Sequence, residues 1–85
     1  RCAYALPAHS QTVSDVRFSA SGELLLTGSF DGSLRVWGSR DFRLLSTLSG
    51  HADKVMGVDF APDERHLVSA GFDRTIKLWS HSSEF

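Results

Sequence analysis

The sequence predicts an all-β fold made of two matched units, and three observations lead to that prediction. Residues 9–37 align with residues 51–79 without a gap, so the chain repeats itself with a period of 42 residues. Short stretches alternate between apolar and polar residues, which is the pattern of half-buried strands. Glycine, serine, aspartate and proline lie between these stretches, where they favour tight turns. The sequence shows no sustained helical period.

The repeat is carried by identical residues in one register. The identical pairs are His9/His51, Val13/Val55, Val16/Val58, Phe18/Phe60, Leu25/Leu67, Phe30/Phe72, Asp31/Asp73 and Trp37/Trp79. Other core positions keep their character, namely Leu26/Val68, Leu34/Ile76, Val36/Leu78 and Thr27/Ser69. Because a unit of this kind cannot bury its apolar faces alone, the two units are expected to stack on each other.

The first unit is predicted to contain four strands. They are expected at residues 13–18, 23–29, 33–37 and 42–48. Val16 and Phe18 stand at alternating positions near the end of the first stretch, and the third stretch alternates strictly between polar and apolar residues. Asp31-Gly32, between the second and third stretches, is a strong signal for a two-residue hairpin.

The second unit is predicted to repeat three of these strands and to lack the fourth, outer one. The strands are expected at residues 55–60, 66–71 and 75–79. Pro62 supplies the fixed φ that suits a tight turn after the first of them. Asp73-Arg74 is a weaker hairpin signal than its counterpart in the first unit, because arginine adopts positive φ poorly. Residues 2–6 are predicted as the outer strand of a preceding unit.

Four short strands in about forty residues, ending in tryptophan, are typical of one blade of a β-propeller. The pattern resembles the WD-repeat family, and the resemblance is carried by Ala8-His9, Gly50-His51, the turn residues Asp31 and Asp73, and the terminal Trp37 and Trp79. The family usually has aspartate after this tryptophan, whereas this chain has Gly38 and Ser80. The predicted fold is therefore a fragment of a β-propeller with two four-stranded antiparallel blades, the last of which lacks its outer strand.

The whole chain, residues 1–85, is expected to be part of a single propeller domain. Residues 1–7 would be the outer strand of a preceding blade, residues 8–49 one repeat, and residues 50–85 a second and C-terminal repeat. Propellers close with about four to eight blades, so two blades leave apolar faces uncovered. The remaining blades of a longer parent chain are the predicted partners of these faces, and closure of a ring by several copies of this chain is the alternative.

The resemblance implies a structural hydrogen-bond relay within each blade. Its members would be His9, Thr27, Asp31 and Trp37 in the first blade, and His51, Ser69, Asp73 and Trp79 in the second. The chemistry is sound, because a buried indole N–H needs an acceptor and a hydroxyl can accept it while donating to a histidine nitrogen. An aspartate in the turn can then accept from the other histidine nitrogen.

Serine, histidine and aspartate also make up hydrolase triads, which gives an enzymatic alternative. The same set occurs twice at one spacing, threonine replaces serine in one copy, and no nucleophile elbow is present. We therefore predict no catalytic residue. Four histidines without cysteine pairs or close histidine spacing predict no metal site, and no cofactor is expected. His66 and His81 are predicted to be exposed to solvent.

Composition limits the partners further. A net charge of −1 argues against a broad electrostatic surface for nucleic acid or anionic lipid. Cys2 is the single cysteine, so no disulfide forms within the chain, and it is predicted to be a small buried hydrophobe. Neither a transmembrane run nor a signal-peptide pattern is present, which predicts a soluble intracellular protein without a membrane partner.

Propeller partners often dock on the face that carries the loops before the innermost strands and the second hairpins. The candidate partner-binding residues there are Ser14, Phe30, Asp53, Lys54, Met56 and Phe72. Exposed aromatic residues at such a position would be good anchors for a partner. The alternatives are that Phe30 and Phe72 pack against a neighbouring blade, that Met56 fills a gap, and that Lys54 is a solvated charge.

Several stretches resemble more closely the WD-repeat subunits of the spliceosomal U4/U6 small nuclear ribonucleoprotein, and residues 51–59 (HADKVMGVD) are the most distinctive. This resemblance implies a non-catalytic scaffold in the nucleus that acts in pre-mRNA splicing. Its implied partners are pre-mRNA-processing factor three, a cyclophilin and, indirectly, small nuclear RNA. The alternative is a WD-repeat adaptor in another complex, such as a ubiquitin-ligase substrate receptor or a chromatin or signalling adaptor.

Overall fold

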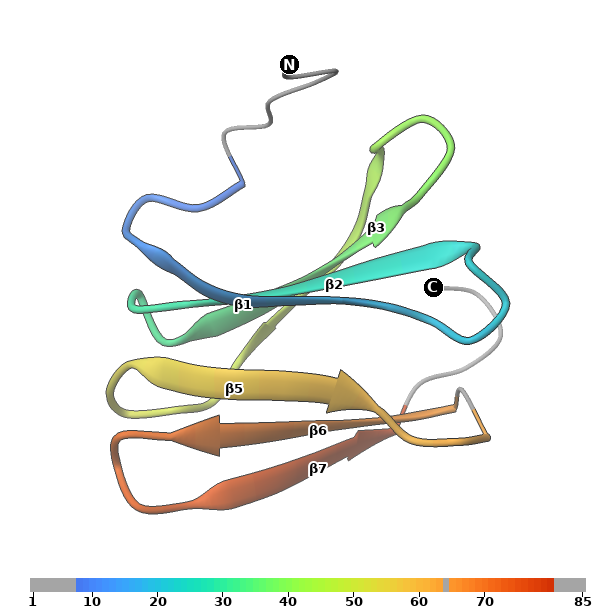
Figure 1. Cartoon of the computed structure of the whole chain (residues 1–85). Helices are drawn as coiled ribbons and strands as arrows, with labels where there is room; N and C mark the ends of the chain where they lie inside the picture. Colours follow the sequence, from blue (N-terminus) through green and yellow to red (C-terminus); the bar gives the residue numbers. More distant parts are fainter. Residues whose placement is uncertain (1–7, 64, 81–85) are drawn as a thin grey trace.

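The computed structural model describes residues 8–63 and 65–80, and these form two antiparallel sheets that lie one above the other (Figure 1). The first sheet contains β1 (Val13–Phe18), β2 (Leu24–Ser29), β3 (Ser33–Gly38) and β4 (Leu44–Ser49), paired in that order. The second sheet contains β5 (Val55–Phe60), β6 (His66–Gly71) and β7 (Ile76–Ser80). The all-β prediction of two propeller blades, with four and three strands, is confirmed. The strand predicted at residues 2–6 and His81 lie outside the described residues.

The strand predicted at residues 42–48 begins two residues later than expected. Phe42 adopts a positive φ of 55°, and its N–H donates to the Gly38 carbonyl at 3.0 Å. It therefore closes the turn between β3 and β4 instead of opening a strand. Its ring packs against a small buried cluster of Ala8, Leu25 and Trp37 on the outer side of the first sheet.

The hairpin between β2 and β3 and the hairpin between β6 and β7 share one backbone conformation, although their turn sequences differ. Gly32 has a φ of 87° and Arg74, at the matching position, has a φ of 68°. In each turn the residue with positive φ donates its N–H to a carbonyl at the end of the preceding strand, at 3.2 Å. The weak hairpin signal at Asp73-Arg74 thus forms the same turn as the strong one, with an L-residue in the left-handed region.

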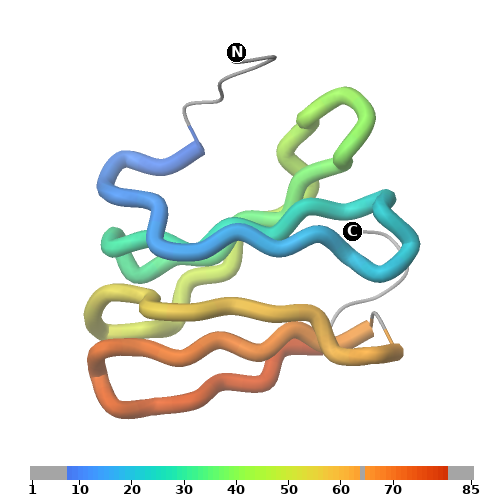
Figure 2. The backbone as a smooth tube through the Cα atoms, in the orientation of Figure 1, coloured from blue at the N-terminus to red at the C-terminus, as the bar shows by residue number. Residues whose placement is uncertain are grey.

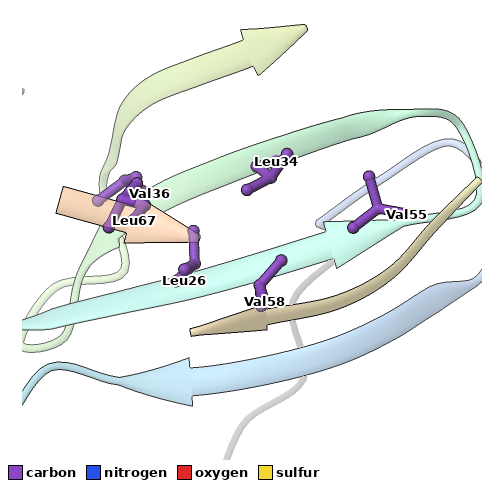
Figure 3. Packing of buried hydrophobic residues seen from close by; sticks show 6 residues of the cluster. All are labelled: Leu26, Leu34, Val36, Val55, Val58 and Leu67. Atoms are coloured by element: carbon purple, nitrogen blue, oxygen red, sulfur yellow. The ribbon is translucent and has the colours of Figure 1, made fainter. Parts of the chain in front are cut away.

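The main core lies between the two sheets. Leu26, Leu34 and Val36 of the first sheet meet Val55, Val58 and Leu67 of the second, as Figure 3 shows. All six are nearly or fully buried. We call this contact between the sheets the junction. Its closest approach is at Gly28, where an added Cβ would lie 2.8 Å from one γ-carbon each of Val55 and Val58.

Polar contacts also cross the junction, where β1 runs beside β5 (Figure 2). The Ser14 hydroxyl donates to the Val55 carbonyl at 2.6 Å. The Val58 N–H donates to the Asp15 carboxylate at 3.1 Å. These two bonds fix β1 and β5 against each other, and we refer to them as the Ser14/Asp15 clasp.

The outward faces of the two sheets carry exposed apolar side chains. Val13, Val16 and Phe18 are 41%, 43% and 62% exposed on the first sheet. Ile76 and Leu78 are 77% and 68% exposed on the second, whereas their counterparts Leu34 and Val36 are fully buried in the junction. Burial at these positions therefore depends on a neighbouring sheet and not on the strand's own sequence.

Candidate functional site

The first sheet brings His9, Thr27, Asp31 and Trp37 into one hydrogen-bonded chain. The Trp37 indole N–H donates to Thr27 Oγ1 at 3.1 Å, and Thr27 Oγ1 lies 2.7 Å from His9 Nε2. The other ring nitrogen, His9 Nδ1, lies 3.2 Å from an Asp31 carboxylate oxygen. The tautomer that satisfies every group has the hydroxyl donating to Nε2 and Nδ1–H donating to the aspartate.

The second sheet repeats this arrangement with serine in place of threonine. The Trp79 indole N–H donates to Ser69 Oγ at 2.9 Å, and Ser69 Oγ lies 2.6 Å from His51 Nε2. His51 Nδ1 lies 3.2 Å from Asp73 Oδ2. The side chains of both histidines are fully shielded from solvent.

Strand register brings the members of each chain together. Trp37 pairs with Leu25 across β2 and β3, two residues from Thr27, so the indole and the hydroxyl lie on one face of the sheet. The aspartate stands in the turn that joins these strands, and the histidine precedes the innermost strand. The relay therefore connects the turn, two strands and the entry segment of each blade.

The aspartates also cap their own turns. Asp31 accepts hydrogen bonds from the backbone N–H and the hydroxyl of Ser33 at 2.9 and 2.5 Å. Asp73 accepts the corresponding bonds from Thr75 at 3.1 and 2.6 Å. A carboxylate with several donors holds a hairpin turn in one conformation.

These contacts determine the protonation of the site. Burial alone would raise the pKa of Asp31, but the hydrogen bonds from Ser33 and the neighbouring His9 outweigh it and lower the pKa to about 2. For Asp73, hydrogen bonds led by the Thr75 hydroxyl lower the pKa well below its usual range. Burial also lowers the pKa of His9, with Asp31 opposing the change. Near neutral pH both aspartates are therefore charged and His9 is neutral.

The order hydroxyl, histidine, aspartate is that of a hydrolase triad, but the hydroxyl cannot serve as a nucleophile. Ser69 is fully buried and Thr27 is 4% exposed. In each chain the hydroxyl oxygen is also the acceptor for an indole N–H. A substrate carbonyl has no approach to either oxygen in this arrangement, so the geometry suits structural connection better than acyl transfer.

Two of the partner-binding candidates, Phe30 and Phe72, lie beside Lys54. Its ammonium lies 5.0 Å from the centre of the Phe30 ring and 5.4 Å from the centre of the Phe72 ring. Both distances fit cation–π contacts. Phe72 is 62% exposed, while Phe30 is half-buried. Lys54 comes from the second sheet's entry loop and Phe30 from the first sheet, so this group spans the junction.

The other candidates lie in different surroundings. Asp53 is exposed, and its carboxylate accepts the Lys54 N–H at 2.7 Å. Met56 is 47% exposed on β5. Ser14 belongs to the clasp, since its hydroxyl donates to Val55 across the junction.

Two features of this region were not expected from the sequence. The sequence predicts Lys54 as a partner-binding residue or a solvated charge and gives no indication of its ring contacts to both phenylalanines. The clasp residue Asp15 was missed altogether. A signal was present, because Lys54 and Asp15 are positions where the repeats differ: their counterparts are Thr12 and Gly57.

Among the described residues, no group of three histidine, cysteine, aspartate or glutamate side chains is arranged to hold a metal ion. The same part of the chain contains no helix with the length and apolar character needed to cross a membrane.

Two stacked antiparallel sheets, each with a tryptophan-to-aspartate relay, define a pair of blades from a repeat protein of the β-propeller class. The family model of the WD domain, G-beta repeat, matches residues 1–38 and 42–80, and the chain belongs to this WD40 family. Members of the family generally serve as scaffolds for protein interactions and are typically non-catalytic. The second match begins before β4, which pairs with β3 in the first sheet, so one sequence repeat contributes strands to two sheets.

Proposed function

We propose that this chain is part of a non-catalytic scaffold of the spliceosomal U4/U6 small nuclear ribonucleoprotein that acts in pre-mRNA splicing in the nucleus. The observation that carries this proposal is the resemblance of its sequence to pre-mRNA-processing factor four, the WD-repeat subunit of that particle. The most distinctive stretch is residues 51–59. The same stretch supplies Lys54, which connects the two sheets on the loop face.

The docking surface in this proposal is the group formed by Phe30, Asp53, Lys54 and Phe72, which we call the loop-face patch. Phe72 offers a large exposed ring, and aromatic residues often anchor protein interfaces. The ammonium of Lys54 is held between two rings, so little side-chain entropy is lost when a partner covers it. Met56 would extend the apolar part of the surface, and Ser14 would contribute through the junction.

The proposed protein partners are pre-mRNA-processing factor three and a cyclophilin, with small nuclear RNA associated indirectly. The near-neutral charge of the chain supports protein contacts over direct RNA contacts. The remaining blades of the ring would cover the outward faces that carry Val16 and Ile76. In this arrangement residues 8–49 and 50–85 are successive repeats of one domain.

Affinity purification of the tagged parent protein from nuclear extract tests the proposal. We expect co-purification of the two named proteins together with U4 and U6 small nuclear RNA. Replacing Phe72 with serine and Lys54 with alanine is expected to reduce recovery of the protein partners at least several-fold. The matched control is Arg65→Ala, an exposed cation in the opposite β5–β6 turn, which should leave recovery unchanged.

A second candidate function is that of an adaptor in another complex, either as a ubiquitin-ligase substrate receptor or as a chromatin or signalling adaptor. The same loop-face patch would serve it, because the patch itself carries no feature specific to RNA processing. Recovery of ubiquitin-ligase or chromatin subunits without spliceosomal proteins would replace the first proposal with this one.

A further inference from the structure

The outward face of the second sheet, which we call the open face, is built from Gly57, Asp59, Val68, Ala70, Ile76 and Leu78. Ile76 and Leu78 are among the most exposed apolar side chains in the described part of the chain. The corresponding residues of the first sheet are Asp15, Arg17, Leu26, Gly28, Leu34 and Val36, and all of them except Arg17 make contacts at the junction. The junction therefore shows what a neighbouring sheet requires of such a face.

The open face differs from its junction counterpart at two positions that decide the fit. The first is Ala70, which stands where the first sheet has Gly28. At Gly28 an added Cβ would lie 2.8 Å from the nearest γ-carbons of Val55 and Val58. Carbon atoms that are not bonded pack at about 3.5–4.0 Å, so a methyl group has no room there. A neighbour that presents two valines in the same geometry collides with Ala70.

The second difference is Gly57, which stands where the first sheet has Asp15. Asp15 accepts the Val58 N–H at 3.1 Å across the junction. Gly57 has no side chain to repeat that bond, and the open face has a shallow hollow lined by Gly57, Val68 and Ala70. The second sheet thus lacks both bonds of the clasp, because Met56 and Gly57 stand where the first sheet has Ser14 and Asp15. The open face also has a methyl group where the junction has none.

A second copy of this chain would present the wrong surface to the open face. The outward face of the first sheet carries Val13 and Val16, the counterparts of Val55 and Val58. If a second copy stacked on the open face as in the junction, its Val13 and Val16 would lie against the Ala70 methyl group of the first copy. Self-stacking in this geometry therefore combines a steric clash with the absence of both hydrogen bonds that hold the junction.

We propose that the open face accepts a neighbouring β-sheet whose innermost strand carries a residue smaller than valine at the position of Val55 or Val58. It excludes a second copy of this chain's own first sheet. This selectivity follows from the repeat geometry of the junction and rests on the proposal that other blades cover the outward faces. It does not depend on which complex the parent protein serves, so the two proposals can fail separately.

Sedimentation velocity of the 85-residue chain over a range of concentrations tests this selection. We expect the wild-type chain to show no self-association through the open face. Removing the methyl group by Ala70→Gly creates the missing space from one side, and Val16→Ala on the partner surface creates it from the other. Either substitution is expected to strengthen head-to-tail self-association by about tenfold or more, a change that corresponds to about 1.4 kcal/mol per tenfold.

Gly57→Asp combined with Ala70→Gly restores the space and supplies the clasp carboxylate, while Met56 still stands in place of Ser14. This double variant should associate at least as strongly as Ala70→Gly alone. Ile76→Lys, which places a charge on the open face, is the control that should abolish any association through it. Circular dichroism verifies that each variant is folded, and a tandem fusion of two copies allows the same comparison by urea unfolding if a variant is too unstable alone. The proposal is overturned if the wild-type chain self-associates and Ile76→Lys prevents it. It is equally overturned if Ala70→Gly and Val16→Ala both leave association unchanged.

Discussion

At the scale of single residues, the relay explains why four polar side chains are tolerated inside each blade. The indole only donates and the aspartate only accepts, while the hydroxyl and the histidine between them do both. Each polar group in the chain therefore has a partner. A typical hydrogen bond contributes about 1 kcal/mol net, but a buried polar group without its partner costs about 1–3 kcal/mol. The relay therefore matters most when one member is removed.

Replacing the buried His51 with alanine is expected to lower the free energy of unfolding by about 1–3 kcal/mol, because the change leaves the buried Ser69 hydroxyl without its partner. Replacing Asp73 with alanine should change it in the same direction, because His51 then loses its carboxylate acceptor. In a domain of this size, each kcal/mol of lost stability lowers Tm by roughly 4–8 °C. Differential scanning calorimetry measures the change. Asp53→Ala, an exposed aspartate two residues from His51, is the matched control and should change Tm little. An unchanged Tm in both relay variants would contradict the structural role.

The pKa values predict that acid destabilises the fold in two stages. The pKa of His9 is lower in the folded state than its ordinary value of 6.5, so the unfolded chain binds more protons as pH falls through this range, and stability is lost. The pKa of Asp31 falls from 3.8 to about 2 on folding, so its contribution is complete above about pH 4 and is lost between about pH 4 and 2. Urea unfolding as a function of pH measures both stages.

Substitution separates the two stages. His9→Gln is expected to remove the loss of stability that begins below about pH 6.5, and Asp31→Asn should weaken the loss at lower pH, although Asp73 still contributes there. Stability that stays constant from pH 7 to pH 4 in the wild-type protein would contradict the burial of a neutral His9.

At the scale of the elements, the strands and turns follow closely from local sequence. The alternating residues of β3 and β7 and the turn residues Asp31-Gly32 contain the information needed to place them. The start of β4 was less predictable, because Phe42 adopts a positive φ that its side chain does not favour. Packing of its ring against Leu25 and Trp37 offsets that local cost, and such a contact between distant strands has no signal in a short window of sequence.

The hairpin at Asp73-Arg74 provides a test at this scale. Arg74 has a φ of 68°, a conformation that costs an L-residue about 1–2 kcal/mol, whereas glycine loses about 0.5–1 kcal/mol more entropy on folding. Arg74→Gly is therefore expected to stabilise the protein by about 0.5–1 kcal/mol, measured by urea unfolding. The reciprocal control is Gly32→Ala, which should destabilise, since its Cβ would lie 3.0 Å from the His51 carbonyl oxygen. A loss of stability in Arg74→Gly would show that the arginine side chain contributes more than its backbone costs.

At the scale of the whole molecule, the junction decides how the two sheets stack. Apolar residues from both sheets meet there, Gly28 allows the close approach, and the clasp fixes β1 beside β5. Overpacking a core of this kind typically costs about 1–3 kcal/mol. The junction is thus specific for side-chain size as well as apolar character.

Gly28→Ala is expected to destabilise the protein by about 1–3 kcal/mol, because the new methyl group would lie 2.8 Å from both valines. Adding Val58→Ala should return part of this loss, so that the double variant is more stable than the sum of the single changes predicts by at least about 0.5 kcal/mol. Urea unfolding of the wild-type chain, the two single variants and the double variant measures this coupling. Gly57→Ala is the matched control, since its Cβ would make only an ordinary contact of 3.8 Å. Strict additivity would argue against a steric contact at Gly28.

The sequence by itself determined the repeat, the strands, the family and the residue types of the relay, because all of these depend on periodicity and local backbone preference. The WD40 assignment follows from the same pattern. The tertiary structure decided which face of each sheet is covered, since Leu34 is buried and Ile76 is exposed at matching positions. It also decided that Lys54 lies over rings from both sheets and that Asp15 binds β5. These contacts join residues that are far apart in sequence, and their strength depends on the distance between two packed sheets, which no local pattern specifies.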